Sequence, residues 1–338
     1  MMDKITLDVI AQELKVSKNT VSKALRDKPG VSEALRIKIV DIANKYGYKA
    51  KSKKNSEITP IHVTMVCNNA LPPDVHFWPS VLGGIYEYSS QRNISIQTMV
   101  VDLVNGDQHI PFPLYKNYCD GIIVVGTISE KLFAHIATLG IPMVALDHYN
   151  DYVECDYVNT ANKNGALRAL DFLVSHSHKK IGFINNINAP YITSLTDRYL
   201  GFRERMEYHG LAIDENFIWL ESYYENTQYL KEQLDKLDAY GDAPTAWICA
   251  NDLTAYNFCS VLAERGIRVP EDVSIIGFDN IPGIFQPKLT TMEIPKRYLG
   301  RRALQRLMYR LSHPDEPFEN IEIFTRLVDR GSVITIKE

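Results

Sequence analysis

Residues 16–32 read VSKNTVSKALRDKPGVS, a stretch that mixes small polar side chains with apolar residues at helical spacing. Val21, Ala24 and Leu25 fall on one face of a helix, and Ser17 stands where a helix-capping hydroxyl is expected. The exposed face carries hydroxyl, amide and ammonium groups, with no acid before the DKPG that ends the helix. These are the groups that hydrogen-bond to base edges and phosphates.

Two further helices flank this segment. Apolar spacing predicts a helix over about 7–14, begun by Thr6, then a turn at 15–17 and a second helix over 18–25. A third helix starts after Ser32 and stops at Gly47. Two short helices joined by a tight turn and closed by a third form a helix-turn-helix unit, whose second helix enters the major groove. A small protein-binding module is the alternative, but its surface should carry apolar anchors and this one has few.

Charge divides the chain into two unlike parts. The 338 residues have a net charge of −4, yet residues 1–55 hold 13 basic and 6 acidic residues, a net of +7. The remainder holds 24 basic and 35 acidic residues, a net of −11. A basic head on an acidic body is typical of a module that binds a polyanion.

Composition excludes several classes of protein. Hydrophobic residues make up 45% and charged residues 23%, as in globular chains, and no apolar run approaches the roughly 20 residues of a membrane span. Asp3 and Asp8 interrupt any secretory segment, so we expect a cytoplasmic protein with no membrane partner. The cysteines form no CxxC pair and are expected to be buried and reduced: Cys67, Cys119, Cys155, Cys249 and Cys259.

Catalytic and metal-binding motifs are missing from the sequence. His176 and His178 are two apart, a spacing that does not bring two ligands together on a helix, and the other histidines are scattered. There is no GxSxG, no Walker loop and no GxGxxG after a strand. We therefore assign no catalytic residue, no metal and no cofactor, and do not expect an enzyme.

The body alternates short apolar strands with helices. IHVTMVC (61–67), GIIVVG (121–126), IGFINN (181–186), AWICAND (246–252) and VSIIGFDN (273–280) are examples of the strands. Continuous apolar strands between helices predict parallel sheets covered on both faces. Ligands bind such sheets beyond the carboxyl ends of the strands, where Asp147, Asn185, Asn251, Asp252 and Asp279 stand.

The chain resembles the LacI/GalR family of bacterial repressors over essentially its whole length. The head matches in VSxxTVSxAL and the closing YGY, and the body in SHKKIGFI, Arg198 to Phe202, AND (250–252), GFD (277–279) and LVDRGSV. The resemblance implies an all-α helix-turn-helix head joined to an α/β periplasmic-binding-protein-like core of two parallel-sheet lobes. It implies a head over 1–50, a linker over 51–60 and a core over 61–338. Lobe one would span about 61–160 and 293–322, and lobe two about 161–292 and 323–338.

The resemblance also assigns roles in DNA binding. Lys18 and Asn19 take the positions of the main base readers, and phosphate contacts fall on Thr6, Ser17, Thr20, Ser22 and Lys23. The linker departs from the family, because KAKSKKNSEITP (49–60) has no Leu to wedge into the minor groove.

The family binds its effector between the lobes. Arg198, Asn251 and Asp279 take the positions that bond sugar hydroxyls, and Asp147 reaches in from lobe one. Phe77 and Trp78 offer an apolar plate or belong to the core, and Asp252 caps the helix that follows it. Sugars are the family's commonest effectors, and purines also occur.

These residues predict a sequence-specific repressor that binds double-stranded operator DNA as a homodimer under control of a small effector, with a sugar as the expected class. A periplasmic solute receptor shares the clamshell but needs an export signal and no basic head. A sugar-modifying enzyme needs a base, nucleophile or metal at a strand end. A DNA-architecture protein keeps the head but needs no pocket.

Overall fold

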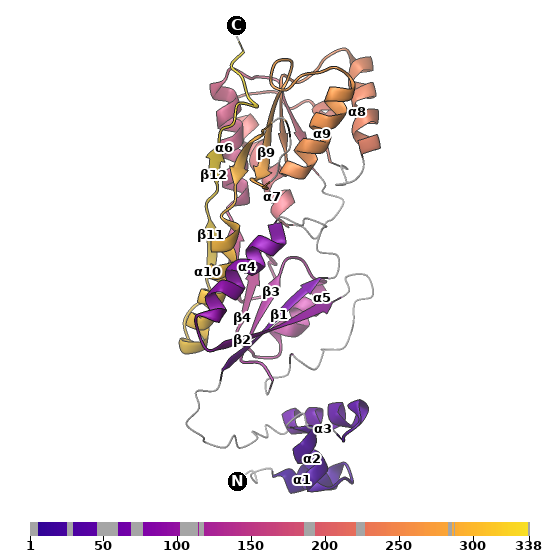
Figure 1. Cartoon of the computed structure of the whole chain (residues 1–338), viewed down its shortest axis with the longest axis vertical. Coiled ribbons are helices and arrows are strands. Elements are labelled where there is room, and N and C mark those ends of the chain that lie inside the picture. Colours follow the sequence, from indigo (N-terminus) through magenta and orange to yellow (C-terminus); the bar gives the residue numbers. More distant parts are fainter. Residues whose placement is uncertain are drawn as a thin grey trace.

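The structure, a computed structural model, describes residues 6–25, 30–45, 60–68, 77–101, 114, 118–185, 193–220, 227–282, 286 and 288–336. These residues form a helical head and two α/β lobes (Figure 1). The predicted linker over 51–60 lies, apart from Pro60, outside the described residues.

The head consists of α1 (Leu7–Glu13), α2 (Lys18–Ala24) and α3 (Glu33–Lys45). The apolar spacing has the predicted result, because the three helices close over a small core of Ile10, Ala11, Val21, Ala24, Ile39 and Ala43. The first two helices each end one residue before the predicted boundary, where the next residue forms the C-cap. The predicted end of the third helix at Gly47 lies outside the described residues.

Lobe one is the sheet of order β11-β5-β4-β3-β1-β2 with its helices. Its strands are parallel to their neighbours, and α4 and α10 lie across one face while α5 covers the other. The elements are β1 (Ile61–Asn68), α4 (Phe77–Ser90), β2 (Ile94–Val101), β3 (Gly121–Val125), α5 (Glu130–Ala137), β4 (Met143–Leu146), β5 (Asp156–Thr160), α10 (Lys296–Ser312) and β11 (Asn320–Ile323).

Lobe two is the sheet of order β12-β10-β9-β8-β6-β7 with its helices. Among the described strands of this sheet, β10 and β12 pair antiparallel and the other neighbours pair parallel. The elements are α6 (Asn162–Ser175), β6 (Ile181–Ile184), α7 (Thr193–Tyr208), a 3-10 turn (Glu215–Phe217), β7 (Ile218–Trp219), α8 (Thr227–Tyr240), β8 (Ala246–Cys249), α9 (Asp252–Glu264), β9 (Ser274–Asp279), β10 (Thr290–Glu293) and β12 (Arg326–Val328).

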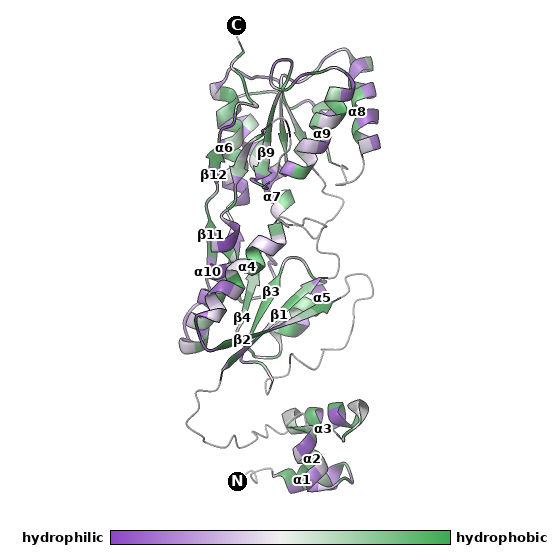
Figure 2. Cartoon of the chain, viewed as in Figure 1, coloured by the Kyte–Doolittle hydropathy of each residue, from purple (hydrophilic) through white to green (hydrophobic). Residues whose placement is uncertain are grey.

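The central strands of both sheets are hydrophobic along their length (Figure 2). Every residue of β3, β4, β6, β8 and β9 is buried, as parallel sheets with two covered faces require. The predicted fold, a helical head on a core of two parallel-sheet lobes, is therefore confirmed. Among the described residues, no helix combines the length and the apolar composition that a membrane crossing requires.

The chain passes between the lobes at residues 160–162, 293–296 and 323–326. Lobe one consequently depends on α10 and β11, which come from the end of the chain. In α10, Gly300 packs so closely on α4 that a Cβ atom would lie 1.9 Å from the carbonyl oxygen of Val81. In α4, a Cβ atom on Gly84 would lie 2.0 Å from the carbonyl oxygen of Arg297. The two helices can approach this closely only because both positions lack a side chain.

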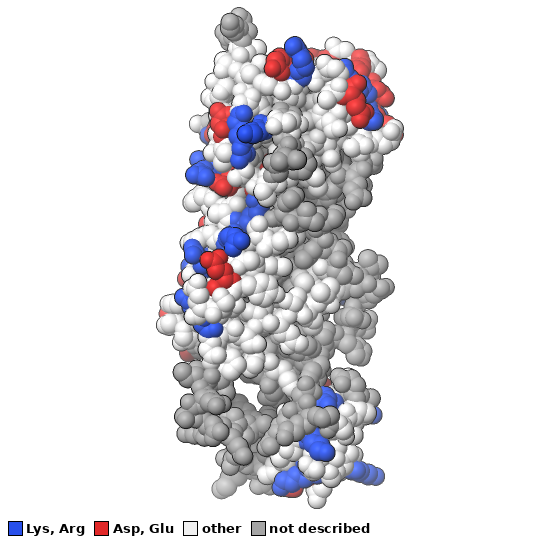
Figure 3. All heavy atoms as spheres, viewed as in Figure 1, with Lys and Arg blue, Asp and Glu red and all other residues white. Residues whose placement is uncertain are grey.

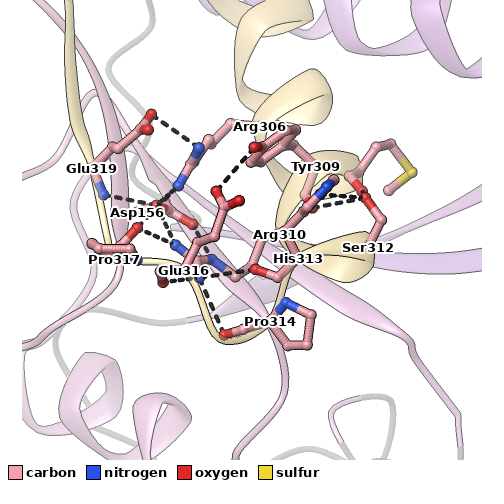
Figure 4. Close-up of polar contacts among 11 residues, drawn as sticks. Asp156, Arg306, Tyr309, Arg310, Ser312, His313, Pro314, Glu316, Pro317 and Glu319 are labelled. Atoms are coloured by element: carbon pink, nitrogen blue, oxygen red, sulfur yellow. Dashed lines mark hydrogen bonds and ion pairs between the residues drawn. The ribbon is translucent and has the colours of Figure 1, made fainter.

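A buried ion cluster fixes the end of α10 to β5 (Figure 4). Asp156 is fully buried, and its carboxylate accepts hydrogen bonds from Arg310 Nε at 2.7 Å and from the Glu319 amide at 2.9 Å. Arg306 Nη2 lies 2.8 Å from the same carboxylate, and its Nη1 lies 2.9 Å from Glu319 Oε2. Arg310 also donates to the carbonyl groups of the turn that leads into β11, at 313, 314, 316 and 317. The cluster therefore sets where β11 begins.

Candidate functional site

The first turn of α2 presents its polar residues to solvent. Ser17 is the N-cap, and its hydroxyl oxygen accepts the backbone N–H of Thr20 at 3.0 Å and lies 2.8 Å from the Thr20 hydroxyl. This capping hydrogen bond satisfies a backbone N–H group of the first turn and so fixes where the helix starts. The start of the helix in turn sets the direction of the Lys18 and Asn19 side chains.

The two predicted base readers are both exposed. Asn19 is exposed, and Lys18 forms an exposed ion pair with Asp8 of α1, with Nζ and Oδ2 2.7 Å apart. Exposed pairs of this kind contribute at most about 1 kcal/mol, so Lys18 can exchange Asp8 for a base or a phosphate.

The residues predicted to contact phosphates lie at the start of α1 and along α2, where Lys23 is in the last turn. Thr6 is the N-cap position of α1 but its side chain makes no capping hydrogen bond, which corrects the predicted capping role. Thr20, Ser22 and Lys23 are half-buried. On the face shown in Figure 3, basic side chains predominate over the head, in line with the net charge of +7 of residues 1–55.

In the core, the Arg198 side chain of α7 is buried and held by protein groups. Its Nε donates to Asn162 Oδ1 at 2.9 Å, its Nη1 donates to the Ala250 carbonyl, and its Nη2 lies 3.2 Å from Asp279 Oδ1. The guanidinium also lies over the ring of Phe278, 3.8 Å from the centroid. Arg198 thus ties α6, α7, β8 and β9 together, and its contact with an effector stays a prediction.

Two of the predicted acids have an unusual backbone. Asp147 follows β4 with φ of +54°, and Asp279 ends β9 with φ of +102°. Residues other than glycine rarely adopt such conformations, and they cluster at functional sites. The Asp279 carbonyl accepts a hydrogen bond from Lys296 Nζ, at the segment that returns to lobe one.

The capping role predicted for Asp252 belongs to its neighbour Asn251, whose predicted contact with an effector stays a prediction. Asn251, not Asp252, is the N-cap of α9, because its Oδ1 accepts the Thr254 amide at 2.8 Å. The buried Asp252 carboxylate accepts the Thr291 hydroxyl at 2.6 Å and the Ile281 amide at 2.9 Å. Burial raises the pKa of Asp252 to about 6 despite these hydrogen bonds. The capping role predicted for Asp252 was therefore wrong by one residue.

Phe77 and Trp78 begin α4 and lie in the hydrophobic core. They are 7% and 8% exposed, and their rings meet edge to face with centroids 5.0 Å apart. Of the two alternatives open in the sequence, this packing favours the core.

A cavity of about 200 Å³ lies between the lobes, and we call it the interlobe cavity. Of the predicted effector residues only Asp147 lines it, although Asn162 links its wall to Arg198. The lining residues are Asp147, Tyr149, Asn159, Thr160, Asn162, Thr193, Ser194, Asp197, Asn320 and Glu322.

Most of these lining residues were not predicted from the sequence as effector-binding residues. Asn159 and Thr160 are the last two residues of β5. The expectation that ligands bind beyond the carboxyl ends of parallel strands could have identified them. Asp197 stands beside Arg198 on α7, whereas Glu322 lies on β11 and gives no local signal.

No group of three or more His, Cys, Asp or Glu among the described residues could hold a metal ion. The cysteines are buried as expected, and burial raises the pKa of Cys119 to about 11 and that of Cys155 to about 12. Both thiols are therefore protonated at neutral pH, the form that is not nucleophilic.

Comparison with known proteins gives two family matches. Residues 6–51 match the model for bacterial regulatory proteins of the lacI family, and residues 170–333 match the periplasmic binding protein-like domain.

One curated relative is the HTH-type transcriptional repressor PurR of Pasteurella multocida (strain Pm70). It is 30% identical over 97% of this chain and 98% of its own length. Among solved structures, the transcriptional regulator CelR–cellobiose complex has a TM-score of 0.71 at 21% identity over 97% of this chain and all of that one. The lac repressor dimer bound to operator and the anti-inducer ONPF has a TM-score of 0.69 at 18% identity, over 98% of this chain and all of that one.

Proposed function

We propose, from the premise that this chain belongs to the lacI family of bacterial regulatory proteins, that it is a cytoplasmic transcriptional repressor. In this proposal a small effector bound between the lobes controls its affinity for operator DNA. The observation that carries the proposal is the capped first turn of α2, which presents Lys18 and Asn19 to solvent within a segment, residues 1–55, that has a net charge of +7.

The reading mechanism follows from side-chain chemistry. Asn19 can make two hydrogen bonds to an adenine edge, and Lys18 can donate to guanine. Thr6, Ser17, Thr20, Ser22 and Lys23 stand around them for phosphate contacts, which set the position of the helix on the duplex. A homodimer places two α2 helices about 34 Å apart, in successive major grooves of a near-palindromic operator.

Control by the effector follows from the lobes. A ligand in the interlobe cavity contacts both lobes at once, because Asp147 belongs to lobe one and Ser194 to lobe two. Its binding favours one relative position of the lobes over another. If that position also sets the spacing of the two heads, effector and operator affect each other's affinity reciprocally. In this proposal Arg198, Asn251 and Asp279 bind the effector; Arg198 is joined to the cavity wall through Asn162 and is paired with Asp279.

The first experiment tests DNA binding. A duplex is selected from a random pool by the wild-type protein, and its affinity is measured as salt concentration rises. Phosphate contacts predict a steep linear fall in log K against log salt. Asn19→Ala should weaken binding to the selected duplex by about 1–3 kcal/mol and leave random DNA nearly unaffected. An equal loss on both duplexes would remove Asn19 as a base reader.

The second experiment tests control by an effector. Asp279→Asn keeps the shape of the side chain beside Arg198 and should impair the release or strengthening of operator binding by an effector. Asp242→Asn is a matched control, because Asp242 forms an exposed pair with Lys180. A normal response in Asp279→Asn would place the effector elsewhere.

The alternative is a solute receptor of the periplasmic-binding-protein class without regulatory DNA binding. It shares the two lobes, but it gives no reason for the head. Failure to bind any duplex in preference to shuffled competitor DNA would favour it. The curated relatives are repressors rather than enzymes, and we propose no catalytic activity.

A further inference from the structure

The interlobe cavity is strongly acidic. Asp147 directly follows β4, Asp197 lies on α7 and Glu322 on β11, so three carboxylates reach one cavity from three separate parts of the chain. The other lining residues carry hydroxyl or amide groups, and none of the ten lining residues given above is a Lys, Arg or His. The described wall thus bears three negative charges and no positive one.

Among the residues that the structure describes, the cations that interact with these carboxylates are already paired with other acids. The charge of Arg198 lowers the pKa of Asp147 and that of Asp197, but Arg198 is itself ion-paired with Asp279 at 3.2 Å. The charge of Lys163 lowers the pKa of Asp197, but Lys163 is itself ion-paired with Glu204 at 2.5 Å. Each pair is neutral overall, so the described part of the chain leaves the charge of the cavity largely uncompensated.

The carboxylates also act on one another. Burial raises the pKa of Asp147 to about 6; Arg198 opposes the rise and the Asp197 carboxylate adds to it. Burial likewise raises the pKa of Asp197, and the Glu322 carboxylate adds to that rise. A chain of like charges across a cavity is unfavourable in the free protein. A cation placed among the three would remove the repulsion.

A second observation points to a ligand at the same place. Thr160 lines the cavity and is only 2% exposed, yet its hydroxyl has no hydrogen-bond partner in the described structure. Buried hydroxyls are nearly always hydrogen-bonded, so an unused one at a cavity wall calls for an explanation. A donor or acceptor on a bound molecule would supply the missing partner.

We infer that the effector carries an ammonium group, held among Asp147, Asp197 and Glu322, with Thr160 bonded to the ligand. The inference rests on the proposed function and specifies the chemistry of its effector. The cavity, at about 200 Å³, is smaller than the roughly 300–1,000 Å³ of most ligand pockets, so the ligand is no larger than a monosaccharide. Amino sugars and short aliphatic amines both have this chemistry, whereas uronates and sugar phosphates would meet like charge.

The experiment compares matched ligands by thermal shift and calorimetry, with EDTA present. The probes are D-glucosamine and D-galactosamine, their neutral parents D-glucose and D-galactose, D-glucuronate, and putrescine. We expect an amine to bind at least tenfold more tightly than its neutral or acidic counterpart. A response to amino sugars identifies a sugar ring as the carrier of the ammonium, and a response to putrescine alone identifies an aliphatic amine.

The pH dependence of binding separates charge from shape. An ammonium group favours the ionised form of Asp147, so its binding should release protons and strengthen as pH rises from about 5 to 6.5, a range in which the amines of all the probes stay protonated. A neutral sugar bound through protonated carboxyl groups would not bind more tightly as pH rises.

Amide variants give a direct test of the three carboxylates. Asp197→Asn and Glu322→Gln keep an oxygen acceptor for hydroxyl groups but lose the charge. Each should weaken amine binding at least tenfold, and each should raise the melting temperature of the free protein because repulsion is relieved. Asp242→Asn, which removes one exposed acid far from the cavity, should leave amine binding unchanged.

Several results would overturn the inference. They are equal binding of an amine and its neutral parent, preferential binding of D-glucuronate, or no stabilisation by any amine at millimolar concentration. Stabilisation by calcium chloride alone in EDTA-free buffer would indicate a metal site instead. Operator binding is measured in parallel. If a neutral sugar releases operator, the proposed function stands and only the ammonium inference fails.

Discussion

Replacing Asp156 by Asn tests whether the buried cluster of Figure 4 holds lobe one together. The substitution keeps the size of the side chain but removes the charge that faces Arg306 and Arg310, both only 3% exposed. Breaking a buried ion pair costs about 3–5 kcal/mol, because the remaining charge is left uncompensated. Glu319 still lies 2.9 Å from Arg306, so we expect the lower end, about 3 kcal/mol.

The assay is urea unfolding followed by circular dichroism, with thermal melting alongside. A loss of about 3 kcal/mol corresponds to a fall in melting temperature of roughly 6–12 °C for a domain of this size. Asp238→Asn is the matched control. It breaks another Asp–Arg pair, at 2.7 Å to Arg265, but Asp238 is 72% exposed, and we expect a cost below about 1 kcal/mol. Equal effects of the two variants would refute the reasoning.

The same cluster predicts a dependence on pH. Burial by itself would raise the pKa of Asp156, but hydrogen bonds from Arg310, Arg306 and the Glu319 amide more than offset it and lower the pKa below its usual value. A lowered pKa in the folded state stabilises the protein above about pH 4, and this stability is lost as pH falls through the folded-state pKa. The difference between wild type and Asp156→Asn should therefore shrink below about pH 4.

Three further predictions concern single positions. Asp8→Asn should free Lys18 from its ion pair and remove a negative charge that repels the DNA phosphates. Binding to any duplex should strengthen by on the order of fivefold, as measured by fluorescence anisotropy at fixed salt. Gly300→Ala should destabilise lobe one by about 1–3 kcal/mol in urea, because its methyl group would collide with the Val81 carbonyl. The pKa of Asp147 is raised to about 6 in the folded state, so its ionisation should make the wild type less stable as pH rises from about 4 to 6. Asp147→Asn should not show this decrease, and melting curves across that pH range would check it.

The sequence predicted the helices and sheets well, because the signals for them are local. In α2 the apolar residues, the cap at Ser17 and the DKPG stretch lie within one short segment, and the observed helix differs from the prediction by one residue. The fully buried strands were equally clear as short apolar runs between helices. The assignment of the N-cap of α9 to Asp252 instead of Asn251 shows the limit of such signals, because two adjacent polar residues can each begin a helix.

The interlobe cavity could not be predicted in the same way. Its acids come from β4, α7 and β11, which lie far apart along the chain, and only the fold brings them together. Glu322 stands on a strand with alternating burial, where an acid is typical of a solvent-facing position. The effector contact predicted for Arg198 stays a prediction, and the protein partners of its guanidinium, Asn162 and the Ala250 carbonyl, depend on packing that the sequence does not specify.

The position of β11 beside β5 has a consequence for biosynthesis. Asn320 pairs with Tyr157, so the edge of the first sheet stays open until about 160 further residues have left the ribosome, some 8–30 s at roughly 5–20 residues per second. The head has its own core and needs nothing beyond its first few dozen residues. A nascent or prematurely terminated chain would therefore display a finished DNA-reading module while the lobes that should govern it are still incomplete.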